Sequence, residues 1–115
     1  MLKIKNGYII DCRDFREFVK EYYNREVDPV ANHAEYLGND SFLQIDVDKE
    51  GPDEWYPDEE DIASSPEDAI NKWLSDEDDF RYLERELGIN ESIILWDLCR
   101  KDVIPEGSYI LKIWW

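Results

Sequence analysis

The chain has 115 residues, of which 29 are Asp or Glu and 13 are Lys or Arg, so its net charge is −16. This length predicts one domain, and the acidity argues against direct binding to nucleic acids or anionic membranes, because both require basic side chains. With 43% hydrophobic and 14% aromatic residues, the sequence differs from an acidic disordered tail and predicts a folded core.

The cysteines and the apolar runs indicate the compartment. No apolar run reaches the roughly 20 residues that span a bilayer, and the N-terminus carries no apolar signal segment. Cys12 and Cys99 match no metal or redox spacing, and their apolar surroundings favour buried free thiols over a disulfide. Together these features predict a cytoplasmic protein.

Few groups suited to catalysis are present. His33 is the single histidine, and the five glycines are scattered, so the sequence contains no phosphate-binding loop. Pairs of carboxylates arise by chance among 29 acids, and nothing selects one pair as an acid and a base. We therefore expect a protein that is not an enzyme and needs no cofactor, with His33 at the surface.

The first residues predict a hairpin followed by a helix. Residues 3–10 surround an Asn-Gly pair, which favours a type I′ turn. Asp14 is expected to cap a helix that runs to about Asn24, with Glu17 completing a capping box. The apolar face of this helix is predicted to consist of Phe15, Phe18, Val19 and Tyr22.

The middle of the chain predicts a short helix, a strand and a long loop. Residues 28–38, which include His33, predict the helix. Phe42 to Asp48 alternates between apolar and polar side chains, as a half-buried strand does, and its inner face is expected to hold Leu43, Ile45 and Val47. Glycine and proline then break regular structure from Lys49 to Ser64.

Two further helices are predicted next. Ser65-Pro66 opens the first, because serine caps helices and proline suits the first turn. Its buried residues are expected to be Ala69, Ile70, Trp73 and Leu74. The second helix is expected to start at residues 75–78 and to end at Gly88, with a stripe of Phe80, Leu83 and Leu87.

The last part of the chain predicts a helix and a strand. Asn90 can cap the helix, although the run Ile93-Ile94-Leu95-Trp96 also suits a strand. Ser108 to Trp115 alternates as a final strand, with one face formed by Tyr109, Leu111, Ile113 and Trp115 and the other by Ile110, Lys112 and Trp114. One of Trp114 and Trp115 must then face away from the core, where a helix covers it or where it marks a homodimer contact or a second binding surface.

These elements together predict an α+β domain. We expect a small, mostly antiparallel sheet of about four strands, including the N-terminal hairpin and the C-terminal strand, packed against four or five helices.

The net charge is concentrated in one part of the chain. Residues 46–81 hold fifteen acids and three bases and therefore carry −12 of the total −16. Acids in the first turn of a helix are favoured by the helix dipole. The loop acids have no such compensation, and their mutual repulsion destabilises the fold. A solvated face that provides solubility is one interpretation of this segment, and a binding surface is the other.

We interpret the acidic segment as a candidate surface for a basic partner. Trp55 and Tyr56 interrupt the acids, and aromatic residues in a polar loop are typical of interface anchors, although they can also fold back onto the core. The predicted partner-binding residues are Asp46, Asp48, Glu50, Asp53, Glu54, Trp55, Tyr56, Asp58, Glu59, Glu60, Asp61, Asp76, Glu77, Asp78 and Asp79.

A metal site is the alternative use of the same segment. Asp46, Asp48 and Glu50, followed by Gly51, resemble the opening of an EF-hand calcium loop. The resemblance ends there, because Pro57 stands where the loop needs a bidentate Glu and the preceding run is strand-like. The three acids are weak candidates for calcium binding, and no metal is assigned to them.

In size, acidity and lack of catalytic groups the chain resembles DNA-mimic inhibitors of phages and mobile elements, including anti-restriction and anti-CRISPR proteins. The resemblance is compositional and rests on residues 46–79. It implies that carboxylates stand in for phosphates and occupy the basic surface of a nucleic-acid-binding enzyme or nuclease, in the host cytoplasm if a phage encodes the protein. An immunity protein or antitoxin that neutralises a basic nuclease toxin, of the barstar type, has the same composition and stays open.

Overall fold

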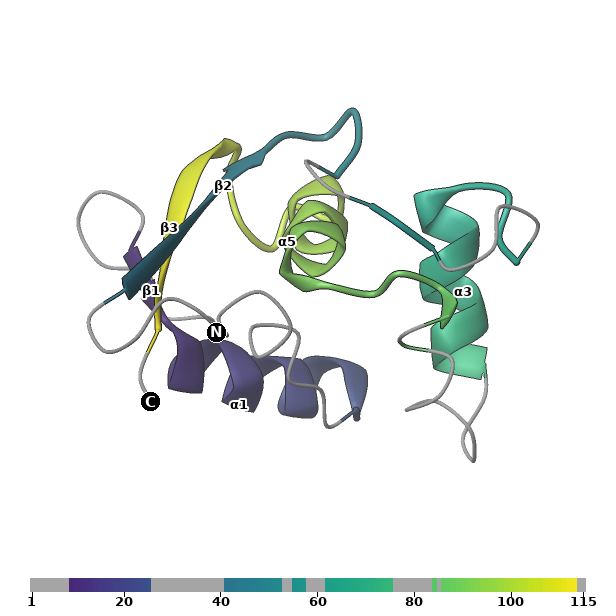
Figure 1. Cartoon of the computed structure of the whole chain (residues 1–115), viewed down its shortest axis with the longest axis horizontal. Coiled ribbons are helices and arrows are strands. Elements are labelled where there is room, and N and C mark those ends of the chain that lie inside the picture. Colours follow the sequence, from purple (N-terminus) through teal and green to yellow (C-terminus); the bar gives the residue numbers. More distant parts are fainter. Residues whose placement is uncertain are drawn as a thin grey trace. The chain divides into compact units, whose positions relative to one another are not determined.

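The computed structural model describes residues 9–25, 41–52, 55–57, 62–75, 84 and 86–113. Within these ranges the elements are β1 (Ile9–Asp11), α1 (Cys12–Tyr23), β2 (Ser41–Val47), α3 (Pro66–Ser75), α5 (Glu91–Arg100) and β3 (Gly107–Ile113) (Figure 1). This combination of helices with a sheet confirms the predicted α+β class. The chain forms two compact units, Met1–Asp46 with Gly107–Trp115 and Val47–Glu106, and the expected single domain stays a prediction.

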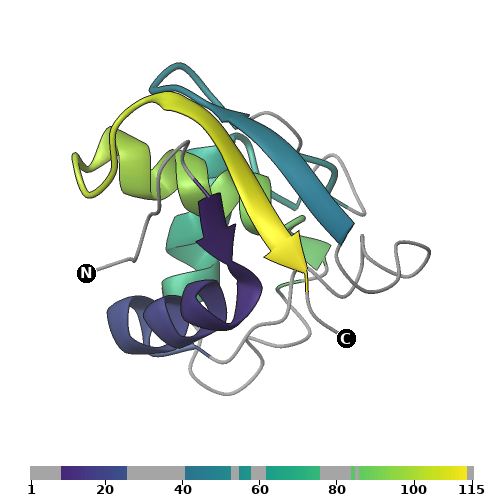
Figure 2. The ribbon, with the colours of Figure 1, turned by 90° about the vertical axis from the view of Figure 1, so that its left-hand side faces the viewer.

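The sheet of the first unit is mixed. Its strand order is β1-β3-β2, and β1 runs parallel to β3 with Ile10 opposite Leu111. The arrows of β2 and β3 point in opposite directions (Figure 2). The described sheet thus has three strands rather than about four, and the prediction of a mostly antiparallel sheet is wrong at β1, because a long crossover lets Ile9–Asp11 pair with the C-terminal strand.

Several predicted elements lie outside the described residues. These are the turn and first arm of the N-terminal hairpin, the helix at 28–38 with His33, the start of the helix at 75–88, and the Trp114-Trp115 pair.

The strands follow the predicted alternation of apolar and polar side chains. Ile45 and Val47 of β2 are buried, as are Tyr109 and Leu111 of β3. On the opposite, exposed face, Ser108 Oγ donates a hydrogen bond to Asp46 Oδ1 at 2.8 Å. The same hydroxyl accepts one from Gln44 Nε2 at 2.9 Å. These side chains link the end of β2 to the start of β3.

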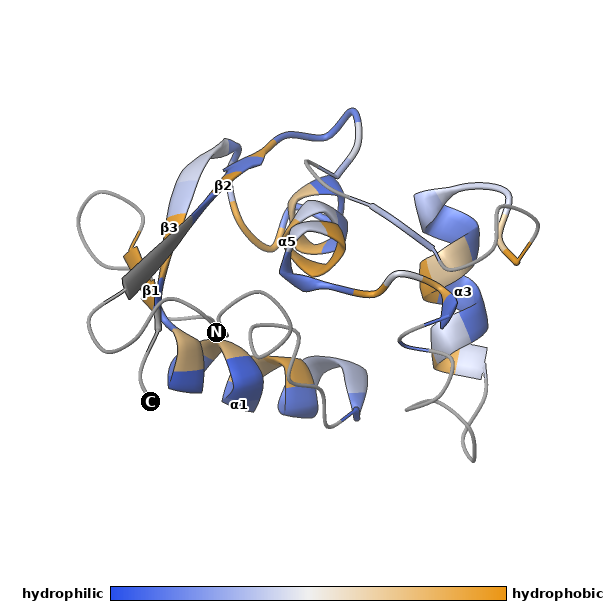
Figure 3. Ribbon diagram, viewed as in Figure 1, coloured by the Kyte–Doolittle hydropathy of each residue, from blue (hydrophilic) through white to orange (hydrophobic). Residues whose placement is uncertain are grey.

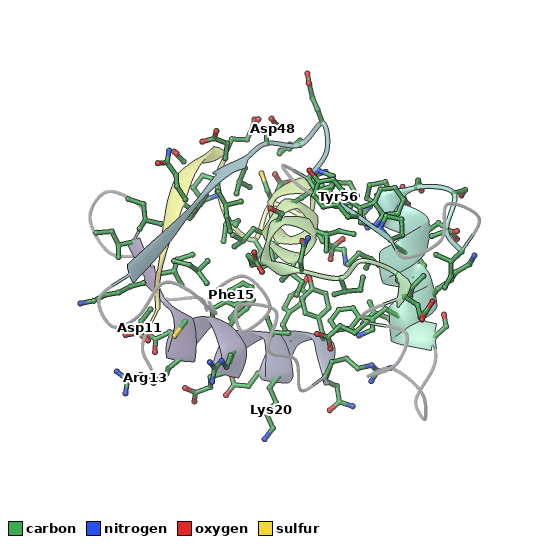
Figure 4. The ribbon with its side chains drawn as sticks, viewed as in Figure 1. Asp11, Arg13, Phe15, Lys20, Asp48 and Tyr56 are labelled. Carbon is green, nitrogen blue, oxygen red and sulfur yellow. The ribbon has the colours of Figure 1, made fainter. Side chains whose placement is uncertain are left out.

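Helix α1 begins earlier than predicted. Asp11, not Asp14, is its N-cap, and Asp11 Oδ1 accepts a hydrogen bond from the Arg13 N–H at 2.9 Å. The predicted end at Asn24 is confirmed, since Asn24 is a left-handed C-cap with a φ of 58°. Figure 4 shows Phe15 projecting from α1 toward the sheet and Lys20 pointing away.

The buried face of α1 differs from the prediction at one position. Phe15, Phe18 and Val19 are buried as expected, and Cys12 and Tyr23 join them, whereas Tyr22 is 43% exposed. The earlier start at Cys12 extends a stripe in steps of three and four residues that reaches Tyr23 instead of Tyr22. The hydrophobic side of α1 therefore faces the sheet (Figure 3).

Helix α3 in the second unit starts as predicted. Ser65 Oγ accepts a hydrogen bond from the Asp68 N–H at 3.1 Å, and Pro66 occupies the first helical position. Asp68 Oδ2 accepts from the Ser64 N–H at 3.0 Å and lies 3.2 Å from Lys72 Nζ. Ala69, Ile70 and Trp73 are buried, whereas Leu74, which was also expected to be buried, is only partly so.

The helix prediction for residues 91–100 is confirmed over the strand alternative. Asn90 Oδ1 accepts a hydrogen bond from the Ile93 N–H at 3.0 Å and so caps α5. Every residue from Glu91 to Cys99 is buried, including the polar side chains of Glu91, Ser92 and Asp97. Figure 3 accordingly shows both hydrophobic and hydrophilic residues along α5.

A network of charged side chains lies at the C-terminal end of α5. The Asp97 side chain is fully buried, and its Oδ1 lies 2.7 Å from Arg100 Nε and 2.7 Å from Arg100 Nη2. Lys101 Nζ lies 2.8 Å from Oδ2, and the Arg100 guanidinium also stacks over Trp96, 4.8 Å from the ring centroid. Asp97 therefore serves the fold rather than the surface.

Both cysteines are buried and free, as predicted. Burial raises the pKa of the Cys99 thiol, and the charges of Glu106, Asp48 and Asp102 add to that shift, against the opposing charge of Lys49. No helix within the described ranges is long and apolar enough to cross a membrane.

Replacing Arg100 and Lys101 together with Met should destabilise the protein. The double variant removes two positive partners of a buried carboxylate, and we expect the free energy of unfolding in urea to fall by about 3 kcal/mol. Adding Asp97→Leu to that variant should restore most of the loss, because the buried charge is then gone. A double variant as stable as the wild type would contradict this account of the network.

Asp68 should make part of the stability dependent on pH. The Ser64 backbone N–H and Lys72 hold the pKa of this carboxyl below its ordinary value of 3.8. A lowered folded-state pKa contributes stability that is present above the unfolded-state value and is lost as the pH falls through the folded-state value. Asp68→Asn should therefore reduce the loss of unfolding free energy between about pH 5 and pH 2, measured by urea titration.

The control for this prediction is Glu67→Gln. It removes a neighbouring carboxylate from the same helical turn, and Glu67 is 63% exposed. If Glu67→Gln and Asp68→Asn flatten the pH dependence equally, the Ser64 contacts have no special role.

Candidate functional site

Five of the fifteen predicted partner-binding residues lie in the described part of the chain. They are Asp46, Asp48, Glu50, Trp55 and Tyr56. The other ten fall outside it: Asp53, Glu54, Asp58, Glu59, Glu60, Asp61, Asp76, Glu77, Asp78 and Asp79.

Asp46 and Asp48 have different structural environments. Asp46 is exposed at the end of β2 and belongs to the first unit, where it accepts the hydrogen bond of Ser108. Asp48 belongs to the second unit, just after β2 (Figure 4). Its Oδ1 accepts hydrogen bonds from the Glu50 N–H at 2.8 Å and the Gly51 N–H at 3.3 Å. Asp48 thus shapes its own loop through an Asx turn.

The loop after β2 presents charge to solvent. Asp48, Lys49 and Glu50 are all exposed. Lys49 is the single base in this stretch, and its Nζ lies 2.6 Å from Asp102 Oδ1. The hydrogen bond and the charge of Asp102 raise the pKa of the Lys49 ammonium, and the charge of Glu106 adds to this effect. The one positive charge of the loop is therefore already matched by an acid.

Two further acids, Asp102 and Glu106, lie outside the acidic segment predicted from sequence. Both are exposed, and together with Asp48 they act electrostatically on the Cys99 thiol. Sequence reasoning missed them because residues 82–115 carry a net charge of only −2. The sequence could have indicated them through strand pairing. If the strand at 42–48 pairs antiparallel with the final strand, the residues that follow the first strand lie near those that precede the second.

Trp55 and Tyr56 have opposite roles. Trp55 is half-buried, and its Nε1–H donates a hydrogen bond to the Leu87 carbonyl at 2.8 Å. Tyr56 is 73% exposed. The two outcomes that the sequence left open are thus divided between the pair: Trp55 packs back onto the scaffold and Tyr56 faces solvent.

Gly88 fixes the chain beneath Tyr56. It has a φ of +72°, and the Ile89 N–H bonds to the Glu84 carbonyl at 2.8 Å, as in a Schellman helix end. A Cβ at Gly88 would lie 2.8 Å from Pro57 N and 2.9 Å from the Tyr56 carbonyl carbon. The turn at Gly88 and the Tyr56-Pro57 peptide are therefore in direct contact.

The metal alternative gains no support from the described residues. Among them, no three His, Cys, Asp or Glu side chains gather in a way that could hold a metal ion. The Asp46 and Asp48 oxygens named above already accept hydrogen bonds from the protein itself.

Comparison with protein families, with curated proteins and with solved structures finds no match. What the surface can do therefore has to follow from its own residues. We define the acidic surface as Asp48, Glu50, Tyr56, Asp102 and Glu106 of the second unit; all five are exposed. Exposed carboxylates and an exposed aromatic ring each suit a cationic ligand.

Gly88→Ala should destabilise the protein more than a surface substitution does. A left-handed backbone costs a non-glycine residue about 1–2 kcal/mol, and the new methyl group would also collide with the Tyr56-Pro57 backbone. We expect a loss of at least that size in the free energy of unfolding, measured in urea.

Gly51→Ala is the matched control for this prediction. A Cβ at Gly51 meets nothing within 4 Å, and its φ is not in the left-handed region, so the change should stay within about 0.5 kcal/mol of the wild type. Equal stability of the two variants would show that Gly88 does not pin the chain.

Proposed function

We propose that the protein is an acidic, non-enzymatic inhibitor that binds the basic, nucleic-acid-binding surface of a partner protein. The observation that carries this proposal is the acidic surface itself: it has four exposed carboxylates from two chain segments, the positive charge of Lys49 is already paired with Asp102, and Tyr56 is exposed in the same unit. The partner is an enzyme or nuclease that handles nucleic acids.

The placement of the acids favours binding over solubility. Solubility needs only dispersed charge and a modest net value, whereas residues 46–81 concentrate −12 in one segment. Exposed like charges repel one another and reduce stability. A partner rich in Lys and Arg relieves this repulsion, so the acidity that costs stability in the free protein contributes affinity in the complex.

The chemistry of the proposed partner follows from its binding of nucleic acid. A surface that holds phosphates carries clustered Lys and Arg side chains, and exposed carboxylates can occupy the same cations. Complementary fields speed association and make it sensitive to salt. The complex should therefore weaken steeply as ionic strength rises, and nucleic acid should compete with the inhibitor for one surface.

A competition experiment tests the proposed function. The immobilised protein is incubated with lysate of the cells in which it occurs, and bound proteins are eluted with a salt gradient or with duplex DNA or RNA. We expect the retained partner to bind nucleic acid and to be released by it. Capture that no nucleic acid reverses would contradict the proposal.

Two matched double variants then locate the surface. Asp48→Asn with Glu50→Gln neutralises two acids of the acidic surface, and Asn preserves the Asx turn. Glu17→Gln with Glu21→Gln neutralises two exposed acids of α1. The first pair should lower the association rate with the captured partner several-fold and reduce its salt dependence. The second pair should change both values little, and equal effects would show that only total charge matters.

A further inference from the structure

Among the large hydrophobic side chains of the described residues, Tyr56 is the most exposed. Its side chain is 73% exposed. Tyr22 is the useful contrast, because it is 43% exposed but its ring stacks on Phe18 with centroids 5.4 Å apart and meets Tyr23 edge-on at 4.8 Å. The ring of Tyr22 is thus already engaged, and that of Tyr56 is available to a ligand.

The backbone that carries Tyr56 is held on both sides. The Trp55 indole is bonded to the Leu87 carbonyl, and Gly88 abuts the Tyr56-Pro57 peptide too closely for any side chain to fit between them. Proline at position 57 restricts the backbone further. A tyrosine on such a support loses only its two side-chain torsions on binding, so its contacts convert into affinity with little entropic cost.

The acids that flank Tyr56 in the sequence favour a cation as its ligand. In the sequence, two acids precede the Trp55-Tyr56 pair at 53–54, and four follow Pro57 at 58–61. The face of an aromatic ring is itself negative and attracts cations. Both features act in the same direction and disfavour anionic or purely apolar ligands at this position.

The shape and hydration of the cation determine how well a lysine or an arginine side chain binds to the ring. A guanidinium is planar, weakly hydrated and able to stack on a ring while its N–H groups bond to carboxylates. An ammonium is compact and strongly hydrated and gains less from the ring. We propose that Tyr56 recognises an arginine guanidinium, so that the acidic surface prefers arginine-rich over lysine-rich partners. This inference rests on the proposed function for the basic nature of the partner.

Two peptides of equal charge test this preference. Fluorescein-labelled nona-arginine and nona-lysine are titrated with the full-length protein at low ionic strength, and Kd is measured by fluorescence anisotropy. The wild type should bind nona-arginine more tightly. Tyr56→Ala should weaken nona-arginine binding about two- to fivefold, the range expected for an exposed cation–π contact, and should weaken nona-lysine binding less.

Two further tyrosine variants serve as controls. Tyr56→Phe keeps the ring and should retain the preference for arginine. Tyr22→Ala removes an exposed aromatic residue from α1 and should leave both affinities unchanged. Far-UV circular dichroism checks that each variant is folded, which is expected for Tyr56→Ala because the side chain it truncates is mostly solvent-exposed.

The possible negative results of the peptide titrations distinguish the two proposals. If Tyr56→Ala weakens both peptides equally or neither of them, arginine recognition by Tyr56 is overturned. The proposed function survives that result if Asp48→Asn with Glu50→Gln weakens both peptides. If neither peptide binds the wild type at low salt, both proposals are overturned.

Discussion

The pairing of β3 with two strands that are distant in sequence is the constraint on which the rest of the structure depends. β1 lies on one edge of β3 and β2 on the other. Because β2 and β3 are antiparallel neighbours (Figure 2), the chain that leaves β2 returns at Gly107 beside its point of departure. The entropy of closing this long loop grows only slowly with its length. The same closure brings Asp48 and Glu106 within electrostatic range of Cys99.

The carboxylates of this chain fall into two groups that total charge does not distinguish. Asp11, Asp68 and Asp97 cap helices or bind bases, and their charge stabilises the fold. Glu50 and Glu106 are exposed, and the charge they add brings repulsion. Lys49 offsets only a part of it, through Asp102. High acidity is thus compatible with a stable scaffold, because the structural acids are paired individually while the surface acids remain exposed to solvent.

Local signals in the sequence predicted most of the described helices and strands. The caps at Ser65 and Asn90 and the glycine end at Gly88 follow from backbone chemistry that acts within a few residues, and the structure confirms all three. Orientation and long-range pairing were not predictable in this way: the same Ile9-Ile10 pattern suits a parallel or an antiparallel neighbour. The division of roles between Trp55 and Tyr56 depends on the Leu87 carbonyl, which is far away in sequence.

The burial of α5 has a consequence for how such a protein changes over generations. Every residue of this helix from Glu91 to Cys99 is buried, so nearly every substitution there alters packing or leaves a polar group unsatisfied. The exposed loop after β2 is under no comparable restriction, since surface substitutions usually change stability little. Mutational drift can therefore rewrite the charge pattern of the surface while the scaffold stays fixed, and new partners become accessible without a new fold.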